Sequence, residues 1–201
     1  HGARYTATGT KLPSGNAMNA WSRTVVFCGM SLLWGLAQAA LDIGETAPEF
    51  TAKVALAGNL QSYSLHDELR RGPVVLYFFP SAFSVGCSIE AHQFAEALDD
   101  YKALGASVVG VSRDDLETQK KFSVQECRGK FPVASDADQS IMKAYDAVLH
   151  FRPDYANRVS YVIAPNGKII YQYTSLNPMK HVSNTLTALR NWAKTGMVQQ
   201  P

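Results

Sequence analysis

The apolar residues of this chain change their spacing within one short stretch. Val74–Phe79 is a continuous run of β-branched, aliphatic and aromatic residues, which is typical of a strand buried on both faces. Beyond Cys87 the apolar positions recur at helical spacing, at Ala91, Phe94, Ala95, Leu98 and Tyr101. The pattern therefore predicts a strand, then a turn that ends near Cys87, then a helix.

Further strands are predicted on both sides of this unit. Residues 54–64 contain two short strands around a turn at Gly58-Asn59. Ser107–Val111 is a second buried strand, which completes a strand-helix-strand unit with parallel strands. Residues 159–164 and 168–174 form an antiparallel hairpin, because the intervening Pro-Asn-Gly supplies the positive φ of a tight turn.

Three further helices are indicated by their starting residues. Asp114, with Glu117 three residues later, resembles a capping box. Asp138 is expected to cap a helix over about residues 139–146, and Asn177 with Pro178 at the first helical position opens the last one. The last helix has one apolar face, made of Val182, Leu186, Leu189 and Trp192. Together these elements predict an α/β fold with a central mixed sheet flanked by helices, preceded by a β-hairpin.

Composition adds the size and the general class. The chain has 201 residues, of which 46% are hydrophobic and 18% charged, as expected for one well-buried globular domain. Its formal net charge of +2 is small, and Lys and Arg are scattered without a basic patch. Nucleic acid is therefore not expected as a partner.

The first forty residues differ from the rest. Residues 24–36 are apolar apart from small hydroxyl residues, and Ala37-Gln38-Ala39 offers small residues at a cleavage site, so we interpret residues 1–40 as upstream residues and a signal peptide. An uncleaved membrane anchor over residues 24–41 is the alternative. The expected product is an exported, periplasmic domain over residues 41–201 that retains two cysteines, Cys87 and Cys127.

Cys87 is the candidate reactive group. The predicted turn places it at the start of a helix and at the carboxyl edge of a sheet, where unpaired N–H groups and the helix dipole favour a thiolate. A thiolate at neutral pH needs roughly 2.7 kcal/mol of stabilisation relative to a free cysteine. A helix terminus contributes about 0.3–1 kcal/mol, up to ~2 kcal/mol when partly buried, so a cation or charge-assisted hydrogen bonds are also required.

The spacing Pro80-x-x-x-Ser84-x-x-Cys87 resembles the active-site signature of the peroxiredoxins, the AhpC/TSA superfamily, and the wider sequence FFPSAFSVGCSIEAHQF is similar to their bacterioferritin-comigratory, PrxQ-like branch. The resemblance extends over residues 42–194. It implies a thioredoxin-like fold and thiol-dependent reduction of hydrogen peroxide or organic hydroperoxides, through a cysteine thiolate and a sulfenic acid. It further implies a thioredoxin-like or other thiol reductant, a monomer or homodimer, and no cofactor.

The resemblance also implies roles for individual residues. Cys87 would be the attacking thiolate, and Arg158 stands where peroxiredoxins carry the arginine that holds the sulfur and the peroxide oxygens. Ser84 would bind the peroxide through its hydroxyl, and Pro80 would shield the thiolate from water. In many PrxQ-like proteins a resolving cysteine lies five residues after the first, but here that position is His92. Cys127 is then the only candidate for the resolving thiol.

Two alternatives and two negative expectations complete the sequence interpretation. A periplasmic thioredoxin-like thiol-disulfide oxidoreductase shares the fold but requires Cys-x-x-Cys, where this chain has Ser84-Val85-Gly86-Cys87. A non-catalytic exported domain would use the two cysteines as a structural disulfide. Glu90 is left out of the catalytic set, because acids are common in a first helical turn. His150 and His181 lack metal-ligand spacing, so no metal site is expected.

Overall fold

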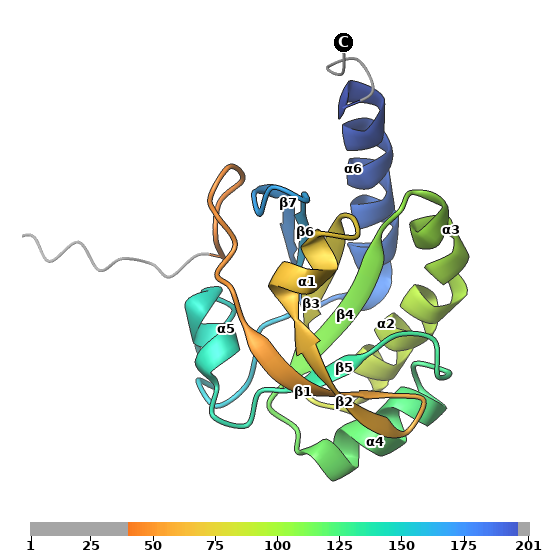
Figure 1. Ribbon diagram of the computed structural model, residues 1–201. Coiled ribbons are helices and arrows are strands. Elements are labelled where there is room, and N and C mark those ends of the chain that lie inside the picture. Colours follow the sequence, from red (N-terminus) through yellow and green to blue (C-terminus); the bar gives the residue numbers. More distant parts are fainter. Residues whose placement is uncertain (1–39, 197–201) are drawn as a thin grey trace, which may run out of the picture. The chain divides into compact units, whose positions relative to one another are not determined.

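The computed structural model describes residues 40–196 and contains one seven-stranded mixed sheet (Figure 1). Its strands follow the order β2-β1-β5-β4-β3-β6-β7. Strands β3, β4 and β5 are parallel neighbours, and all other pairs are antiparallel. The strands are β1 Thr51–Leu56, β2 Asn59–Ser64, β3 Val74–Phe78, β4 Ser107–Ser112, β5 Val133–Ser135, β6 Val159–Ile163 and β7 Ile169–Thr174. The predicted mixed sheet with an N-terminal hairpin is confirmed.

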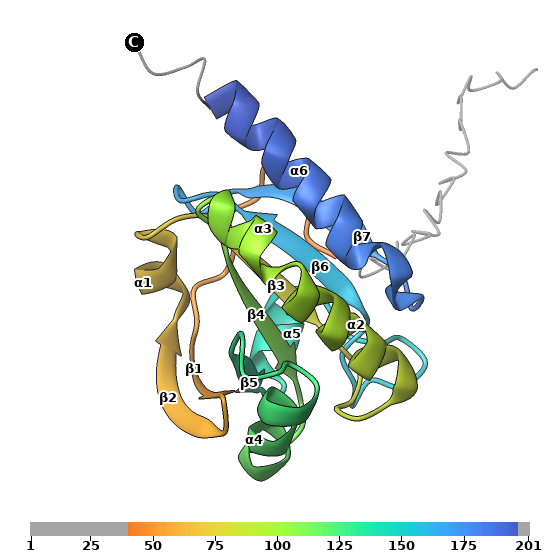
Figure 2. The ribbon, with the colours of Figure 1, turned by 90° about the vertical axis from the view of Figure 1, so that its right-hand side faces the viewer.

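Helices cover both faces of the sheet. They are α1 Leu65–Leu69, α2 Val85–Glu96, α3 Leu98–Ala103, α4 Leu116–Gln125, α5 Ser140–Ala144, the 3-10 helix η1 Pro178–Lys180 and α6 His181–Gly196. In the view of Figure 2, α2, α3 and α6 lie in front of the central strands. Helices α1 and α5 contribute to a separate apolar cluster on the opposite face. The cluster beneath α2 is the one that contains both cysteines, so it is the face that matters for chemistry.

Strand β3 is the centre of the sheet and behaves as its composition predicts. All five of its residues are buried, because neighbouring strands flank both edges and helices cover both faces. Tyr77 shows how tightly this strand packs, since a Cβ added to Gly110 on β4 would lie 2.8 Å from the Tyr77 ring. The chain leaves β3 at its carboxyl end, at the sheet edge where α/β proteins place ligands.

Both predicted hairpins are present, but the turn of the first lies one residue earlier than predicted. The β6–β7 turn carries Gly167 at φ +78°, as its sequence predicts. In the β1–β2 turn the two positive-φ residues are Ala57 and Gly58, and Asn59 already pairs with Leu56 as the first residue of β2. The predicted turn at Gly58-Asn59 is therefore wrong by one position. A two-residue turn with both φ values positive is the type that matches the twist of a hairpin.

The predicted start of α4 is also wrong by one residue. Asp115, not Asp114, is the N-cap, because its Oδ1 accepts a hydrogen bond from the Thr118 N–H at 2.7 Å. The carboxylate of Asp114 has a different partner, since its Oδ2 accepts from the Ala82 N–H at 2.8 Å. Asp114, which the sequence pattern assigns to the start of α4, therefore holds the loop that precedes α2.

Two other helices differ from the prediction. Helix α5 is shorter than expected, and its first turn is held mainly by Asp136, whose carboxylate accepts from the N–H groups of Ile141 and Met142 at 3.0 and 2.8 Å. The predicted cap is wrong by one residue, because Gln139 is in the N-cap position, although Asp138 Oδ1 accepts from the N–H of Ser140, the first residue of α5, at 3.0 Å. The helix expected after Cys87 is divided at Ala97 into α2 and α3, although the hydrogen bond from Tyr101 N to Ala97 O continues across the division.

The C-terminal helix begins as predicted. Asn177 Oδ1 accepts from Met179 N at 3.0 Å, with Pro178 in the first position of η1, and α6 follows. The expected signal peptide and membrane-anchor segments lie almost entirely in residues 1–39, outside the described part of the chain. Within residues 40–196, no helix has the length and apolar character needed to cross a membrane.

Candidate active site

Cys87 lies in the first turn of α2, directly after the loop that leaves β3. Ser84 is the N-cap residue in extended conformation, and its side chain makes no capping hydrogen bond. No capping side chain therefore accepts from the N–H groups of the first turn, in which Cys87 stands. Cys87 is only 1% exposed and belongs to the apolar cluster beneath α2. The site thus places a sulfur atom at a helix N-terminus in surroundings that exclude most water.

The loop over residues 80–84 is anchored at two points. Asp114 accepts the Ala82 N–H, and the same carboxylate oxygen accepts from Ser112 Oγ at 2.6 Å. Phe83 has a positive φ of 62° and packs edge-on against Phe122 of α4, with ring centroids 5.3 Å apart. A positive φ is unfavourable for a bulky residue, so this packing compensates for local strain. Both anchors fix the loop that carries Pro80 and Ser84.

Arg158 contacts the thiol from the start of β6. Its Nη2 donates to Cys87 Sγ at 3.4 Å, its Nη1 donates to Glu90 Oε2, and its Nε donates to the Leu176 carbonyl at 3.0 Å. Arg158 is 4% exposed. Burial acts to lower the pKa of the guanidinium, but the charges of Glu90 and Cys87 outweigh it and raise that pKa. The guanidinium is therefore a permanent buried cation aimed at the sulfur.

Gly86 makes room for this cation. A Cβ added there would lie 3.1 Å from Arg158 Nη2 and 3.9 Å from Pro178, which is tighter than most real contacts. No motif or spacing in the sequence identified Gly86 as a site residue. Its only signal is a glycine inside the first turn of a helix, where glycine is intrinsically unfavourable.

Glu90 and His181 extend the polar cluster away from the thiol. Both are fully buried, and His181 Nδ1 lies 3.6 Å from Glu90 Oε1. Burial raises the pKa of Glu90 to about 8 despite the attraction of Arg158, and burial lowers the pKa of His181 to about 4. Glu90 was expected to be only a first-turn acid that favours the helix dipole, and its place in this cluster corrects that expectation. Its spacing from Cys87 and Phe94 places it on the apolar face of α2, and that is the signal that could have identified it.

Cys127 lies beyond the end of α4, with no exposed surface, and is a free thiol like Cys87. Burial raises the pKa of its thiol well above the usual range, and the charge of Glu126 acts in the same direction. Side-chain contacts on both sides of Cys127 reach α2, from Glu126 to His92 at 2.9 Å and, as a salt bridge, from Arg128 to Glu96 at 3.2 Å. The structure therefore brings Arg158 to Cys87 directly, and holds Cys127 in the same apolar cluster under α2 without bonding it to Cys87.

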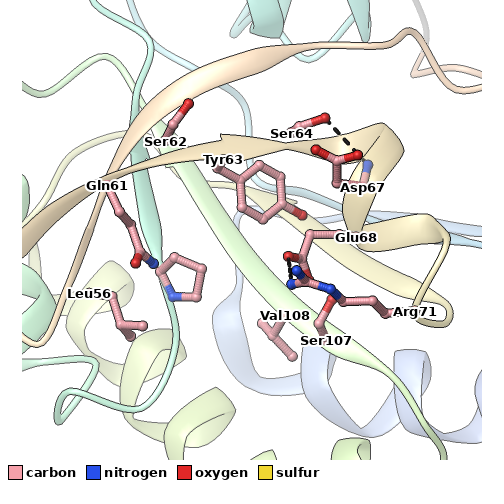
Figure 3. A pocket seen from close by; sticks show the side chains of 11 residues that line it. Leu56, Gln61, Ser62, Tyr63, Ser64, Asp67, Glu68, Arg71, Ser107 and Val108 are labelled. Carbon is pink, nitrogen blue, oxygen red and sulfur yellow. Dashed lines mark hydrogen bonds and ion pairs between the residues drawn. The ribbon is translucent and has the colours of Figure 1, made fainter.

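A cavity of about 490 Å³ lies away from this site (Figure 3). It lies between β2, α1 and the first residues of β4, and Tyr63, Glu68, Arg71 and Ser107 are among the residues that line it. Because β3 and β4 are parallel, the start of β4 is at the opposite edge of the sheet from Cys87. Residues 40–196 also contain no cluster of three His, Cys, Asp or Glu side chains able to hold a metal ion.

Known proteins resemble this chain in sequence. Wheat (Triticum aestivum) chloroplastic peroxiredoxin Q is 32% identical over 149 residues, which cover 74% of this chain and 66% of the wheat protein. Peroxiredoxin Bcp of Xanthomonas campestris pv. campestris is 28% identical over 127 residues, or 60% of this chain and 78% of that protein. The chain thus spans about two thirds of the length of the wheat relative.

A solved structure resembles it in fold. The crystal structure of peroxidoxin BcpB from Mycobacterium tuberculosis superposes with a TM-score of 0.68 at 27% identity, covering 75% of this chain and 97% of that one. The thioredoxin-like fold expected from the sequence is thereby confirmed. A sequence model described as the AhpC/TSA family matches residues 43–172, which include the loop, Cys87 and Arg158. The chain therefore belongs to the AhpC/TSA family, as a member similar to peroxiredoxin Q and Bcp.

Proposed function

We propose that this protein is a thiol-dependent peroxidase that reduces hydrogen peroxide or organic hydroperoxides. The observation that carries the proposal is the contact of Arg158 Nη2 with Cys87 Sγ at 3.4 Å, at the N-terminus of α2. A buried cation and a helix N-terminus both favour the thiolate, which is the nucleophilic form of cysteine. Membership of a family whose curated relatives are named peroxiredoxins supports the same activity.

The reaction follows from the positions of these groups. The Cys87 thiolate attacks one peroxide oxygen, so that an S–O bond forms, the O–O bond breaks and two electrons pass from sulfur to the peroxide. The leaving oxygen takes up a proton and departs as water or an alcohol. We assign Arg158 and the Ser84 hydroxyl to stabilising charge on the two oxygens, because Ser84 is exposed and its side chain is not used as a cap. Pro80, half-buried in the same loop, limits access of water to the sulfur.

The sulfenic acid must then be reduced by a second thiol. We propose that Cys127 attacks it, so that water leaves and a Cys87–Cys127 disulfide forms, which a thioredoxin-like or other dithiol reductant reopens. A disulfide requires Cα atoms within about 4.4–6.8 Å. Cys127 is fully buried behind the end of α4, so the first turn of α2 must unwind for the two sulfurs to meet.

Peroxide consumption with a dithiol reductant tests the proposal. Wild type should turn over, Cys87→Ser should have no activity above buffer while keeping its circular dichroism spectrum, and Cys127→Ser should oxidise once and accumulate sulfenic or over-oxidised Cys87. Activity of Cys87→Ser close to wild type would show that the peroxidase proposal is wrong. Full turnover of Cys127→Ser would leave Cys87 as the only required cysteine and make the external thiol the resolving group.

We also propose that the protein is exported, with residues 1–40 removed near Ala39. The support is the apolar segment followed by Ala37-Gln38-Ala39 in the sequence. Expression of the full chain in a Gram-negative host, followed by fractionation and N-terminal sequencing, tests this. A mature protein that begins near residue 40 in the periplasmic fraction is expected. An intact chain in the membrane fraction would support the anchored alternative instead, and an intact cytoplasmic chain would contradict export.

A further inference from the structure

Four ionisable side chains form one buried cluster, in which Arg158 is the permanent cation. Cys87, Glu90 and His181 are each at most 1% exposed, and Arg158 is 4% exposed. Arg158 contacts Cys87 Sγ through Nη2 and Glu90 Oε2 through Nη1. Glu90 Oε1 faces His181 Nδ1 at 3.6 Å. Two potential anions therefore share one guanidinium, with an imidazole behind the second anion.

The hydrogen bonds of His181 define which of its nitrogens carries the hydrogen. Nε2 lies 2.8 Å from the Ser175 carbonyl, which can only accept, so Nε2 carries the hydrogen. In the neutral imidazole Nδ1 is then an acceptor with one lone pair, and the Ser160 hydroxyl at 2.8 Å and Glu90 Oε1 at 3.6 Å both face it. Glu90 Oε1 makes no hydrogen bond within the described residues, and Nδ1 is the acceptor that it faces. An ionised Glu90 would face a lone pair there, whereas a protonated Glu90 would direct its O–H toward it.

Charge balance leads to the same arrangement. An uncompensated charge is costly in a buried site, so the cluster favours a net charge near zero. When Cys87 is a thiolate, it neutralises Arg158, and the Glu90–His181 pair is neutral only if it holds one additional proton. When Cys87 is an uncharged sulfenic acid, Arg158 needs another anion, and Glu90 is already in contact with it.

We propose that Glu90 and His181 hold one proton while Cys87 is a thiolate, and that Glu90 releases it to solvent when Cys87 is oxidised. Oxidation of the thiolate, Cys87–S⁻ + ROOH + H⁺ → Cys87–SOH + ROH, consumes one proton, which protonates the leaving oxygen. Release from Glu90 supplies one proton, so the solution shows no net uptake. Reduction back to the thiolate returns the proton to Glu90. The inference rests on the proposed peroxidase function and adds a role for a carboxyl and an imidazole that do not touch the peroxide.

The other groups near Glu90 leave this count unchanged. Tyr77 of β3 and Tyr101 of α3 are buried phenols whose pKa values burial raises, so both stay neutral. Burial likewise raises the pKa of Cys127, which keeps that thiol protonated. The raised pKa of Glu90, about 8, and the lowered pKa of His181, about 4, place the stored proton on Glu90 at neutral pH. The Glu90 carboxyl is thus the only group of the cluster that changes charge together with Cys87.

Proton counting during a single oxidation tests the proposal. Reduced Cys127→Ser protein, which stops at the sulfenic acid, is mixed at pH 7 with one equivalent of hydrogen peroxide in weak buffer with a pH indicator. The ultraviolet absorbance of the thiolate establishes the starting state. We expect close to zero net protons per Cys87 oxidised, and close to one in a Glu90→Gln, Cys127→Ser protein. The infrared difference spectrum should lose a protonated-carboxyl band on oxidation, and Glu90→Gln should lack that change.

His181→Phe provides a second variant, with His150→Phe as the matched control on an exposed histidine. Without the Nδ1 acceptor, Glu90 should ionise at lower pH and compete with Cys87 for Arg158. Iodoacetamide labelling of Cys87 should then move to higher pH in His181→Phe and stay in place in His150→Phe. Uptake of one proton by the Cys127→Ser protein, no carboxyl band, or no thiolate at pH 7 would each overturn the proposal. Failure of the peroxidase function is distinct, because peroxide would then not be consumed at all.

Discussion

At the scale of single residues, the arginine contributes more to the thiolate than the helix does. A helix N-terminus stabilises an anion by about 0.3–1 kcal/mol, whereas a charge-assisted hydrogen bond contributes about 1.5–3 kcal/mol when it is excluded from water. Arg158 makes such a bond to Cys87 from a site with 4% exposure. Its orientation is fixed on two other sides, by Glu90 and the Leu176 carbonyl.

Replacement of Arg158 by methionine should therefore impair Cys87 while the fold remains. We expect the rate of oxidation by peroxide to fall by about two orders of magnitude, which corresponds to roughly 2.7 kcal/mol of lost stabilisation. Iodoacetamide labelling should require higher pH. Stopped-flow fluorescence and labelling profiles measure the two effects. Arg190→Met, on the exposed side of α6, is the control and should behave as wild type. An unchanged labelling profile in Arg158→Met would remove Arg158 from the site.

Replacement of Gly86 by alanine should separate activity from stability. Alanine is favoured over glycine in helices by about 1 kcal/mol, so the variant should be at least as stable as wild type toward urea. Its Cβ would lie 3.1 Å from Arg158 Nη2 and displace the guanidinium, so peroxide reduction should slow by about tenfold or more. Gly196→Ala is the matched control, because a Cβ there meets nothing within 4 Å. Equal activity of Gly86→Ala and Gly196→Ala would show that the guanidinium tolerates the methyl group.

The sequence predicted part of this site and missed the rest for identifiable reasons. Cys87, Ser84 and Pro80 were identified because they are close in sequence and share a fixed spacing. Arg158 was identified only through a family resemblance, since it lies 71 residues from Cys87. Ser160 and His181 interact through tertiary packing across 21 residues, and neither belongs to a periodic or motif signal. The Ser160 hydroxyl on the buried strand β6 can be recognised as part of the site only once its partner, His181, is known.

At the scale of elements, α2 and the end of α4 are joined around Cys127. The pairs His92–Glu126 and Glu96–Arg128 connect the two helices on either side of that residue. The position at which many PrxQ-like proteins carry their second cysteine is thus occupied by a histidine that contacts the neighbour of Cys127. These pairs are partly exposed, so each should contribute only about 0.2–1 kcal/mol. Contacts of this strength slow the local unwinding of α2 that lets Cys87 reach Cys127, but they do not prevent it.

Removal of one of these pairs should speed disulfide formation. Glu126→Gln is expected to raise the rate of Cys87–Cys127 cross-linking after one equivalent of peroxide by roughly threefold, because the opening step in α2 then no longer has to break the contact between His92 and Glu126. Quenched alkylation and peptide mass spectrometry measure that rate. Lys120→Ala removes a pair with Glu117 inside α4 and is the control without a link to α2. A rate in Glu126→Gln equal to that of Lys120→Ala would show that the two helices need not separate.

Element types were easier to predict than element boundaries. The buried strand β3 and the β6–β7 hairpin follow from local composition, because a continuous apolar run and a Pro-Asn-Gly turn have few other interpretations. The start of α4 was misplaced because Asp114 and Asp115 are both suitable caps in sequence. Only the tertiary contact with Ala82 explains why Asp114 does not serve as one.

At the scale of the whole molecule, Glu90 and His181 should oppose each other in the pH dependence of stability. Glu90 has a pKa of about 8 in the folded protein against about 4.3 unfolded, so the folded state holds the extra proton between these values and its contribution to stability falls as pH rises. His181 has a pKa of about 4 against about 6.5 unfolded, so the unfolded state holds the extra proton and stability rises with pH in that window. The two slopes cancel between about pH 4.5 and 6.5.

Single variants should reveal the two opposing pH dependences of the free energy of unfolding, which cancel in wild type. In His181→Phe only the Glu90 contribution remains, and it ends at a lower pH than in wild type. The free energy of unfolding, relative to wild type, should therefore decline as pH rises from about 4.5 to the folded-state pKa of Glu90 in that variant, with a slope of up to ~1.36 kcal/mol per pH unit. In Glu90→Gln only the His181 contribution remains, so the relative free energy should rise from about pH 4.5 to 6.5. Above pH 6.5 Glu90→Gln should lose the further decline that wild type shows up to about pH 8.

Urea unfolding at half-unit pH intervals measures these differences, and the exposed-site variant His150→Phe corrects for the loss of an ordinary histidine. Parallel curves for wild type, His181→Phe and Glu90→Gln would mean that neither group changes its protonation on unfolding. That result would contradict the shifted pKa values of Glu90 and His181 in the folded protein.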